Sequence, residues 1–231
     1  MKNPLSILTV TVLSLLSLIS CGEKGSDEPH YAILYDLCEV AGASASSPVT
    51  LLLYLPDSDE AVTLTAQAGA LGSTPPEAGT PVMIAYTPQN QIPYTSSPIT
   101  LYRWSEVTCI PIHTAKETAD LDGWDDDPVW LISSWRAGTK ICIRLKLGYD
   151  TTPRRMGLII DPATVDDPVP TAYLYHDRQG DSPTFDRQYY LTFDIASLWD
   201  LPEIEGLRVI IADAATADGR KTILFKKPQQ I

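Results

Sequence analysis

Short apolar runs of strand length dominate the chain from His30 onward, and clusters of proline, glycine, asparagine and aspartate separate them. Almost none of this region shows the period of about 3.6 residues that marks an amphipathic helix. Runs of about four to eight residues between turn-forming residues are typical of β-strands. The pattern therefore predicts an all-β protein.

The first half of the chain contains five or six of these runs, a number that suits a small closed β-barrel. Turn-forming clusters such as Pro56-Asp57-Ser58-Asp59 separate neighbouring runs. We therefore expect a barrel domain over residues 30–115. Its predicted strands are residues 31–38, 49–55, 61–66, 81–86, 99–104 and 106–113.

The second half begins with an acidic segment, residues 114–128, which we interpret as a linker or a long inter-domain loop. We place the domain boundary in this segment and expect a second domain over residues 116–231. Seven short strands with frequent turn signals indicate a β-sandwich of immunoglobulin type. The predicted strands are residues 129–135, 140–147, 155–161, 171–176, 188–194, 207–212 and 221–225.

Residues 140–147 show the clearest alternation in the chain. One face of this predicted strand carries Ile141, Ile143, Leu145 and Leu147, and the other carries Lys140, Cys142, Arg144 and Lys146. A strand with one apolar and one polar face is expected to be buried on one side. After the fifth strand, residues 195–199 are predicted to form one helical turn with Asp194 as its cap.

The N-terminal segment Met1–Cys21 has the pattern of an export signal. Lys2 supplies a positive start, residues 5–19 are apolar or small, and Ser20 precedes Cys21. Cleavage after residue 20 leaves Cys21 as the new N-terminus, and the segment also has the form of a bacterial lipobox, in which this cysteine is acylated. We expect a signal peptide over residues 1–20, a lipidated (palmitate-type) Cys21 and a flexible tether over residues 21–29.

Two alternatives for this leader are weaker. An uncleaved transmembrane helix needs about 20 apolar residues, whereas this run is shorter and is interrupted by threonines and serines. A buried core helix is disfavoured because residues 22–29, GEKGSDEP, follow at once with small, charged and helix-ending residues. Stable membrane anchoring takes more than one acyl chain, and a diacylated or triacylated cysteine meets that requirement.

The charge of the chain limits its partners. The sequence has 29 acidic and 17 basic side chains, a formal net charge of −12, and loss of the leader removes one lysine and no acid. Binding of nucleic acid requires lysine and arginine opposite the phosphates, so no nucleic-acid partner is predicted. Attraction to anionic lipid is disfavoured for the same reason, and a solvated surface is the simplest interpretation.

Three cysteines follow Cys21, and an exported protein is allowed to form disulfides. Cys38 and Cys109 are the expected pair if any disulfide exists. Cys142 lies in the alternating strand and is expected to be a small packed thiol. No C-x-x-C spacing occurs, so the sequence predicts no cysteine-based metal or redox site.

His176, Asp177 and Asp181 form the cluster with the most chemical potential. One histidine and two carboxylates could ligate a metal or act as a base with its orienting group, but no second histidine lies nearby and zinc-type spacings are absent. We expect His176 to end a strand and to fix the loop that contains Gly180-Asp181. The alternatives are a ligand or partner contact through His176 and Asp181, or a metal-dependent hydrolase that uses both.

The acidic segment offers a second candidate site, because several carboxylates in one loop could bind calcium. An EF-hand loop that starts at Asp120 fails, since its twelfth position is Leu131 rather than glutamate. We expect a solvated loop with no metal or cofactor. Trp124 lies in this loop without a strand to bury it, so it is a candidate contact for a ligand or partner if its side chain is exposed. The aspartates concerned are Asp120, Asp122, Asp125, Asp126 and Asp127.

Catalytic motifs are missing from the sequence, which contains no G-x-S-x-G, H-E-x-x-H, phosphate-binding loop or G-x-G-x-x-G. We therefore expect a protein that is not an enzyme. The remaining aromatic side chains could stack on sugars or anchor a protein partner. Alternation makes most of them core residues or cross-strand pairs; they include Tyr102, Trp104, Trp130, Trp135, Tyr173, Tyr175, Tyr189, Tyr190 and Trp199.

Three motifs in the second half occur in a recognisable order. A strand with two tryptophans, DPVWLISSW at residues 127–135, comes first; Leu174-Tyr175-His176 with Asp181 follows; and Phe193-Asp194-Ile195 comes last. In this order the chain resembles the NigD-like family of exported lipoproteins from two-membrane bacteria. The motifs match over residues 127–199, and the layout matches over most of the mature chain.

This resemblance implies a small OB-like barrel followed by an immunoglobulin-like β-sandwich. The family takes its name from a protein linked to a bacteriocin gene cluster, and an immunity-type role has been proposed by association. The glycine- and proline-rich loops of the N-terminal half depart from the barrel pattern. The resemblance brings no established activity and no catalytic residues.

Together these features predict a membrane-anchored, exported lipoprotein that acts as a non-catalytic binding or interaction module. We expect it in the cell envelope, at the outer membrane, on the periplasmic face or at the cell surface. Its predicted partners are the membrane, through Cys21, and a protein or glycan. A carbohydrate-binding surface lipoprotein is the alternative, and it predicts two or more coplanar exposed aromatic side chains on one face.

Overall fold

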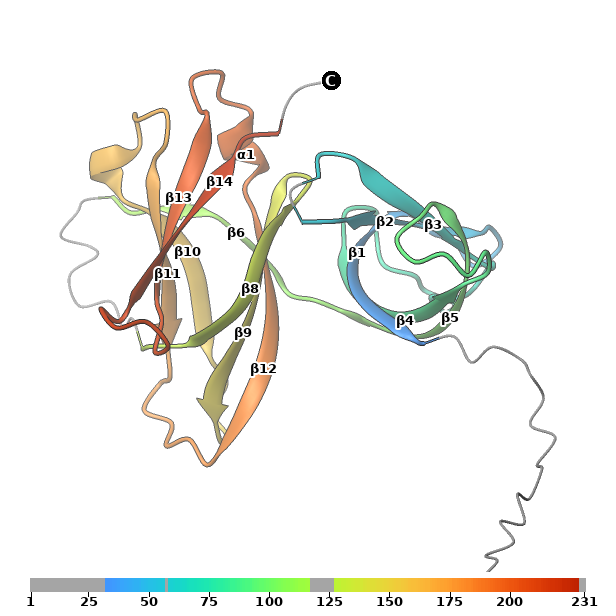
Figure 1. The fold of residues 1–231 in the computed structure, drawn as a ribbon, viewed down its shortest axis with the longest axis horizontal. Helices are drawn as coiled ribbons and strands as arrows, with labels where there is room; N and C mark the ends of the chain where they lie inside the picture. The colour runs from blue at the N-terminus through green and yellow to red at the C-terminus, as the bar shows by residue number, and fades with distance from the viewer. Residues whose placement is uncertain (1–31, 57, 117–126, 229–231) are drawn as a thin grey trace, which may run out of the picture. The chain divides into compact units, whose positions relative to one another are not determined.

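The computed structural model describes residues 32–56, 58–116 and 127–228, and these form an all-β protein (Figure 1). Five strands close into a barrel, and the other strands form two sheets of a sandwich. The predicted fold class, an OB-like barrel followed by a β-sandwich, is therefore confirmed. Over the described ranges, no helix has the length and apolar character needed to cross a membrane.

The barrel is built from the first five strands: β1 (Leu34–Gly42), β2 (Val49–Tyr54), β3 (Ala61–Ala66), β4 (Pro81–Pro88) and β5 (Ser97–Glu106). Their order is β1-β2-β3-β5-β4, and antiparallel pairing of β1 with β4 closes the barrel. β3 and β5 pair in parallel. Small barrels are filled by the inward side chains of each strand, and here Val40, Leu51 and Ile84 are at most 1% exposed.

The sandwich consists of a five-stranded sheet, in the order β14-β13-β11-β10-β7, and a four-stranded sheet, in the order β6-β12-β9-β8. The helical segments are short: η2 (Pro162–Thr164) follows β10, and α1 (Ala196–Trp199) follows β12. The strands are β6 (Cys109–Pro111), β7 (His113–Thr114), β8 (Trp130–Ala137), β9 (Lys140–Tyr149), β10 (Arg155–Ile160), β11 (Thr171–Asp177), β12 (Phe185–Asp194), β13 (Gly206–Ala212) and β14 (Arg220–Lys226).

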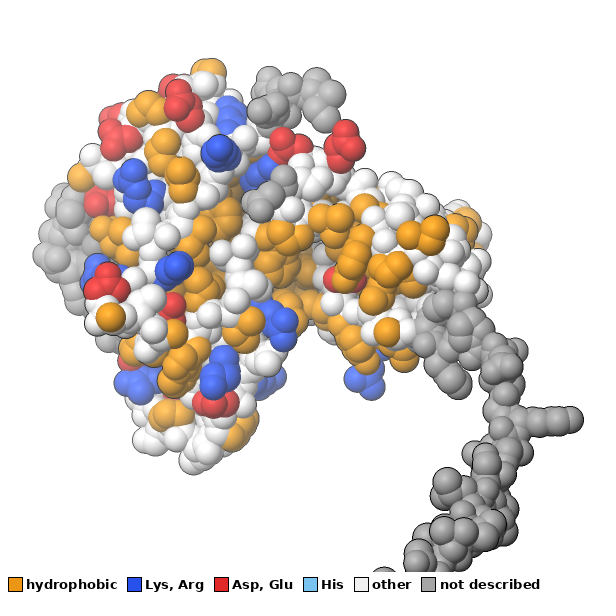
Figure 2. All heavy atoms as spheres, in the orientation of Figure 1, with side chains coloured by type: hydrophobic (Ala, Val, Ile, Leu, Met, Phe, Trp, Pro, Cys, Tyr) orange, Lys and Arg blue, Asp and Glu red, His pale blue; other side chains and the backbone are white. Residues whose placement is uncertain are grey.

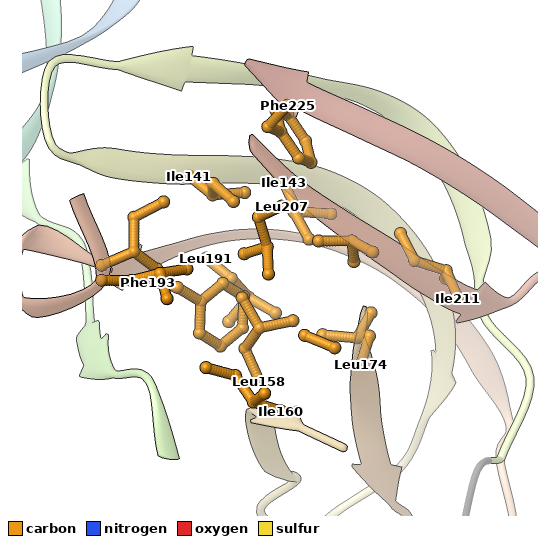
Figure 3. Close-up of a cluster of buried hydrophobic side chains, with 14 of the residues drawn as sticks. Ile141, Ile143, Leu158, Ile160, Leu174, Leu191, Phe193, Leu207, Ile211 and Phe225 are labelled. Carbon is orange, nitrogen blue, oxygen red and sulfur yellow. The ribbon is translucent and has the colours of Figure 1, made fainter. Parts of the chain in front are cut away.

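The core of the sandwich lies between the two sheets (Figure 3). The apolar face predicted for residues 140–147 points into it, since Ile141, Ile143, Leu145 and Leu147 are at most 1% exposed. Side chains of β9 and β12 meet those of β10, β11 and β13 in the same cluster (Figure 3). Burial of such side chains stabilises the fold by about 25 cal/mol for each Å² of apolar surface removed from water.

The strands after β5 differ from the sequence prediction. Residues 106–113 were expected to form one barrel strand, but β6 pairs in parallel with β12 and β7 pairs in parallel with β10. Both short strands thus belong to the sandwich, so the expected boundary between residues 115 and 116 lies too far along the chain. The sequence of a short apolar run does not show which sheet the run joins. The strands that pair with β6 and β7 lie far along the chain, at a distance of nearly fifty residues or more.

The polar face of β9 is also more buried than its alternation indicates. Arg144 and Lys146 are half-exposed as expected, whereas Lys140 is 8% exposed and Cys142 is 1% exposed. Lys140 Nζ donates to Glu39 Oε2 of β1 at 2.6 Å. Burial alone would lower the pKa of Lys140, but the hydrogen bond and charge of Glu39 outweigh it and raise that pKa.

The three described cysteines are free thiols, so the conditional pairing of Cys38 with Cys109 does not occur. Cys38 is buried in the barrel core, whereas Cys109 is exposed on β6. Cys142 is a packed thiol, as expected, and burial raises its pKa to about 12. The predicted cap is present in a modified form: Asp194 Oδ1 accepts a hydrogen bond from Ala196 N at 3.0 Å, although Ile195 occupies the N-cap position.

Candidate binding surface

Two of the residues singled out in the sequence lie outside the described residues. These are Cys21 in the leader segment and Trp124 in the acidic segment. Asp120, Asp122, Asp125 and Asp126 also lie outside them, so only Asp127 of the candidate calcium ligands has a described position. The Asp127 carboxylate forms an ion pair with Arg178, with Oδ1 2.8 Å from Nε, and Oδ2 accepts from Arg178 N at 2.9 Å.

His176 lies near the end of β11, where it faces Met156 of β10, and it is only 2% exposed. Its Nδ1 is 2.8 Å from the carbonyl oxygen of Asp127, and Asp127 N donates to the His176 carbonyl at 3.0 Å. Because a carbonyl oxygen only accepts, Nδ1 is the protonated ring nitrogen. Burial lowers the pKa of His176, so the ring is neutral near pH 7.

Asp181 is tied to a different loop. Its Oδ2 lies 2.7 Å from Arg154 Nη2, and the two side chains are 3% and 1% exposed. The carboxylate also accepts from three backbone N–H groups, those of Asp150 at 2.9 Å, Thr151 at 3.4 Å and Thr152 at 3.5 Å. Burial opposes ionisation of Asp181, but these three donors and the charge of Arg154 outweigh it and lower its pKa.

The cluster predicted around His176 is thus split between two structural tasks. His176 holds the segment at Asp127, and Asp181 joins the 150–154 loop to the turn after β11. A shallow hollow of about 420 Å³ lies beside this turn, and its lining includes Asp181 and Ser182 but not His176. Among the described residues no group of three or more metal-ligating side chains occurs. His176 therefore has no contact with this hollow, and it bonds to the segment at Asp127 rather than to the loop that contains Gly180-Asp181, which it was expected to fix.

A surface that the sequence did not reveal lies on the outer face of the four-stranded sheet. Pairing places Trp130 of β8 opposite Lys146 of β9, which in turn lies opposite Gln188 of β12. In the next row, Ser133, Arg144 and Tyr190 lie side by side. We call these six residues, Trp130, Ser133, Arg144, Lys146, Gln188 and Tyr190, the open sheet face.

The side chains of the open sheet face form a cross-strand ladder. Lys146 Nζ lies 4.9 Å from the centroid of the Trp130 ring, and Arg144 Cζ lies 5.4 Å from that of Tyr190. Arg144 Nη2 donates to Gln188 Oε1 at 2.9 Å. Trp130 is nevertheless 39% exposed. On the surface visible in Figure 2, basic side chains lie among hydrophobic ones over the region that β8, β9 and β12 occupy in Figure 1.

The sequence contained part of the signal for this surface. Alternation placed Arg144 and Lys146 outward, but Trp130 and Tyr190 were interpreted as core residues or cross-strand pairs. A β-bulge between Leu131 and Ser133 shifts the register of β8. Bulges add a residue to one strand and re-aim the side chains that follow, so alternation alone does not tell which residues of β8 share a face with Arg144.

Comparison with known proteins supports the fold. The chain matches no protein-family model and no curated protein sequence. A protein of unknown function, DUF1344, from Bacteroides vulgatus has a similar structure, with a TM-score of 0.66 at 14% identity over 86% of this chain and 92% of that one. A NigD-like immunity protein from Bacteroides caccae gives a TM-score of 0.58 at 20% identity, over 84% and 91% of the two chains.

A third similar structure comes from Bacteroides fragilis and is described as a lipoprotein. It gives a TM-score of 0.59 at 11% identity and covers 86% of this chain and 99% of that one. The resemblance to NigD-like proteins inferred from the motifs is thus confirmed at the level of the fold.

Proposed function

We propose that the protein is a lipid-anchored protein of the cell envelope that binds a protein partner through the open sheet face and catalyses no reaction. The observation that carries this proposal is the ladder formed by exposed Trp130 and the half-exposed side chains Lys146, Arg144 and Tyr190. Tryptophan, tyrosine and arginine are the residues most enriched among those that dominate binding energy at protein interfaces. The solvated face of a sheet is usually polar, so we attribute these aromatic side chains on an open face to partner binding and not to stability of the fold.

The composition of this face favours a protein over a glycan. A sugar needs free aromatic surface for stacking, whereas a cation already lies over each ring of the ladder. Lys146 is already paired with Asp186 Oδ2 at 2.8 Å, whereas Arg144 bonds to the neutral amide of Gln188 and gives the face a basic group on a chain with a net charge of −12. An acidic protein surface is therefore the partner chemistry that this face complements.

Anchoring through Cys21 is the second part of the proposal. The lipobox of residues 18–21 supports it, and the lipoprotein of similar fold is consistent with it. An acyl anchor holds the protein at the outer membrane, on the periplasmic face or at the cell surface, where it meets a partner in two dimensions. An immunity-type role, which the description of the Bacteroides caccae protein suggests, is one form that such binding takes.

The absence of catalysis is supported by how the candidate groups are used. His176 is buried with Nδ1 bonded to a backbone carbonyl, and Asp181 is held by Arg154 and backbone N–H groups. A general base must reach the proton that it removes. Asp181 lines the hollow beside the turn, but His176 does not, so the two side chains are not placed to act together there.

Site-specific photocrosslinking in the producing cell tests the partner surface. Ser133 is exposed on β8, the edge strand of the open sheet face, and Thr222 is an exposed residue of similar size on β14 of the other sheet. A photoreactive amino acid at position 133 should yield one discrete protein adduct, and the same amino acid at position 222 should not. Equal adducts from both positions, or none from position 133, would refute the proposed surface.

A further inference from the structure

A hollow at one end of the barrel is lined by uncharged side chains alone. It measures about 540 Å³ and lies where β3 and β4 end and where β2 and β5 begin. Pro48 from the β1–β2 loop forms one side, and Gln89 from the β4–β5 loop forms another. The volume falls in the range of about 300–1,000 Å³ that is usual for small-molecule sites.

The lining of this hollow contains no ionisable side chain, although 20% of the whole chain is charged. Its polar side chains are two hydroxyls and two amides: Thr65, Thr100, Gln67 and Gln89. Within the described part of the protein, no hydrogen bond involves any of these four side chains. Their donors and acceptors are therefore available to a bound molecule.

The loop that supplies Gln89 is held in a fixed shape. Gln89 N donates to Pro98 O at 2.9 Å, and Asn90 Nδ2 donates to Thr95 Oγ1 at 3.0 Å across the loop. Gln91 is held at a φ of 64°, a left-handed conformation that is uncommon outside glycine. Strained positions persist only where the surroundings over-determine them, and a pre-organised loop lowers the entropic cost of binding.

The position and the chemistry of the hollow together indicate its ligand. OB-type barrels bind oligonucleotides and oligosaccharides beside the loops that join strands 1 to 2 and 4 to 5. An oligonucleotide needs cations opposite its phosphates, and the lining has none. We propose that the hollow binds an uncharged oligosaccharide, whose hydroxyls pair with Thr65, Gln67, Gln89 and Thr100. The apolar faces of its sugar rings contact Pro48 and Pro98.

This site is independent of the open sheet face, which lies on the sandwich. Calorimetric titration of the mature, detergent-extracted protein with neutral hexasaccharides of glucose, mannose, galactose and N-acetylglucosamine tests it. At least one of the four should bind. Hexagalacturonate, a charged counterpart, should bind more weakly because the lining offers no cation.

Variants then locate the site. The double variant Thr65→Ala/Gln89→Ala removes two hydrogen-bonding groups and should weaken binding by about tenfold. Thr63→Ala is the matched control, since Thr63 lies on the same strand but does not line the hollow. All variants should retain the wild-type melting temperature, because the removed side chains have no bonds within the described structure.

Three results would overturn the proposal. The first is that none of the four neutral hexasaccharides binds at millimolar concentration. The second is that the Thr65→Ala/Gln89→Ala variant binds as tightly as Thr63→Ala and the wild type. The third is that hexagalacturonate binds more tightly than every neutral sugar. None of these outcomes bears on the crosslink from Ser133, so the two sites fail or succeed separately.

Discussion

Replacement of Arg144 by alanine separates a binding role of the open sheet face from a structural one. Arg144 is half-exposed, lies over the Tyr190 ring and donates to Gln188. A cation–π contact at an exposed site contributes about 0.5–1 kcal/mol, and exposed cross-strand pairs contribute about 0.2–1 kcal/mol. Loss of Arg144 should therefore lower the free energy of unfolding by about 1–2 kcal/mol, which corresponds to about 2–8 °C in Tm for a chain of this size.

The effect on partner binding should be larger. Arginine at the centre of an interface typically contributes about 2 kcal/mol or more when it is truncated, which corresponds to a loss of about thirtyfold in affinity. We expect Arg144→Ala to reduce the adduct formed from position 133 at least tenfold while the protein stays folded at the growth temperature. Thermal unfolding followed by circular dichroism gives the first quantity, and immunoblotting of crosslinked cells gives the second.

Arg208→Ala is the matched control for this experiment. Arg208 lies on β13, exposed on the other sheet, and donates to Thr171 Oγ1 at 3.2 Å. Its loss should change Tm by a similar small amount and leave the adduct intact. The reasoning is refuted if Arg144→Ala lowers Tm by much more than about 8 °C, or if Arg208→Ala reduces the adduct as much as Arg144→Ala does.

Three further predictions follow from the described contacts. Burial lowers the pKa of His176, so as the pH falls the unfolded chain takes up a proton near pH 6.5 before the folded protein does. The free energy of unfolding should therefore decrease below that pH. In urea unfolding, His176→Gln should lose less stability between pH 8 and pH 5 than the wild type does. A Cβ at Gly206 would lie 2.8 Å from a backbone oxygen of β14, so Gly206→Ala should cost about 1–3 kcal/mol in the same assay, and an unchanged midpoint would contradict this packing. Under native conditions a thiol reagent should label Cys109 alone among the described cysteines, and unfolding should expose Cys38 and Cys142; native labelling of a buried thiol would be inconsistent with the fold.

Most strands were predictable because their pattern is local. The inward set of β9, from Ile141 to Leu147, alternates strictly, and turn-forming residues bound most of the other strands. The pairing of β6 and β7 was not predictable, since it depends on partners in β12 and β10 that are nearly fifty or more residues away. The burial of Lys140 also has a distant cause, a carboxylate 101 positions earlier in the chain.

The candidate sites divide in the same way. His176 was expected to fix the loop that contains Gly180-Asp181, but its partner is the carbonyl of Asp127, 49 positions earlier in the chain, and Asp181 is held by Arg154 instead. The open sheet face depends on register across three strands and on the bulge in β8, neither of which has a sequence signal. The barrel hollow depends on loops that meet in space, and Gln67 and Gln89 have no distinguishing sequence context.

Attachment to the membrane through Cys21 is the claim on which the proposed function depends most. Intact-mass analysis of the protein extracted from membranes measures it directly. The account predicts a chain that begins at Cys21, without residues 1–20, and that carries the added mass of a diacylglyceryl group with or without a third acyl chain. A chain that retains the leader, or one that begins at Cys21 with no added lipid, would contradict it.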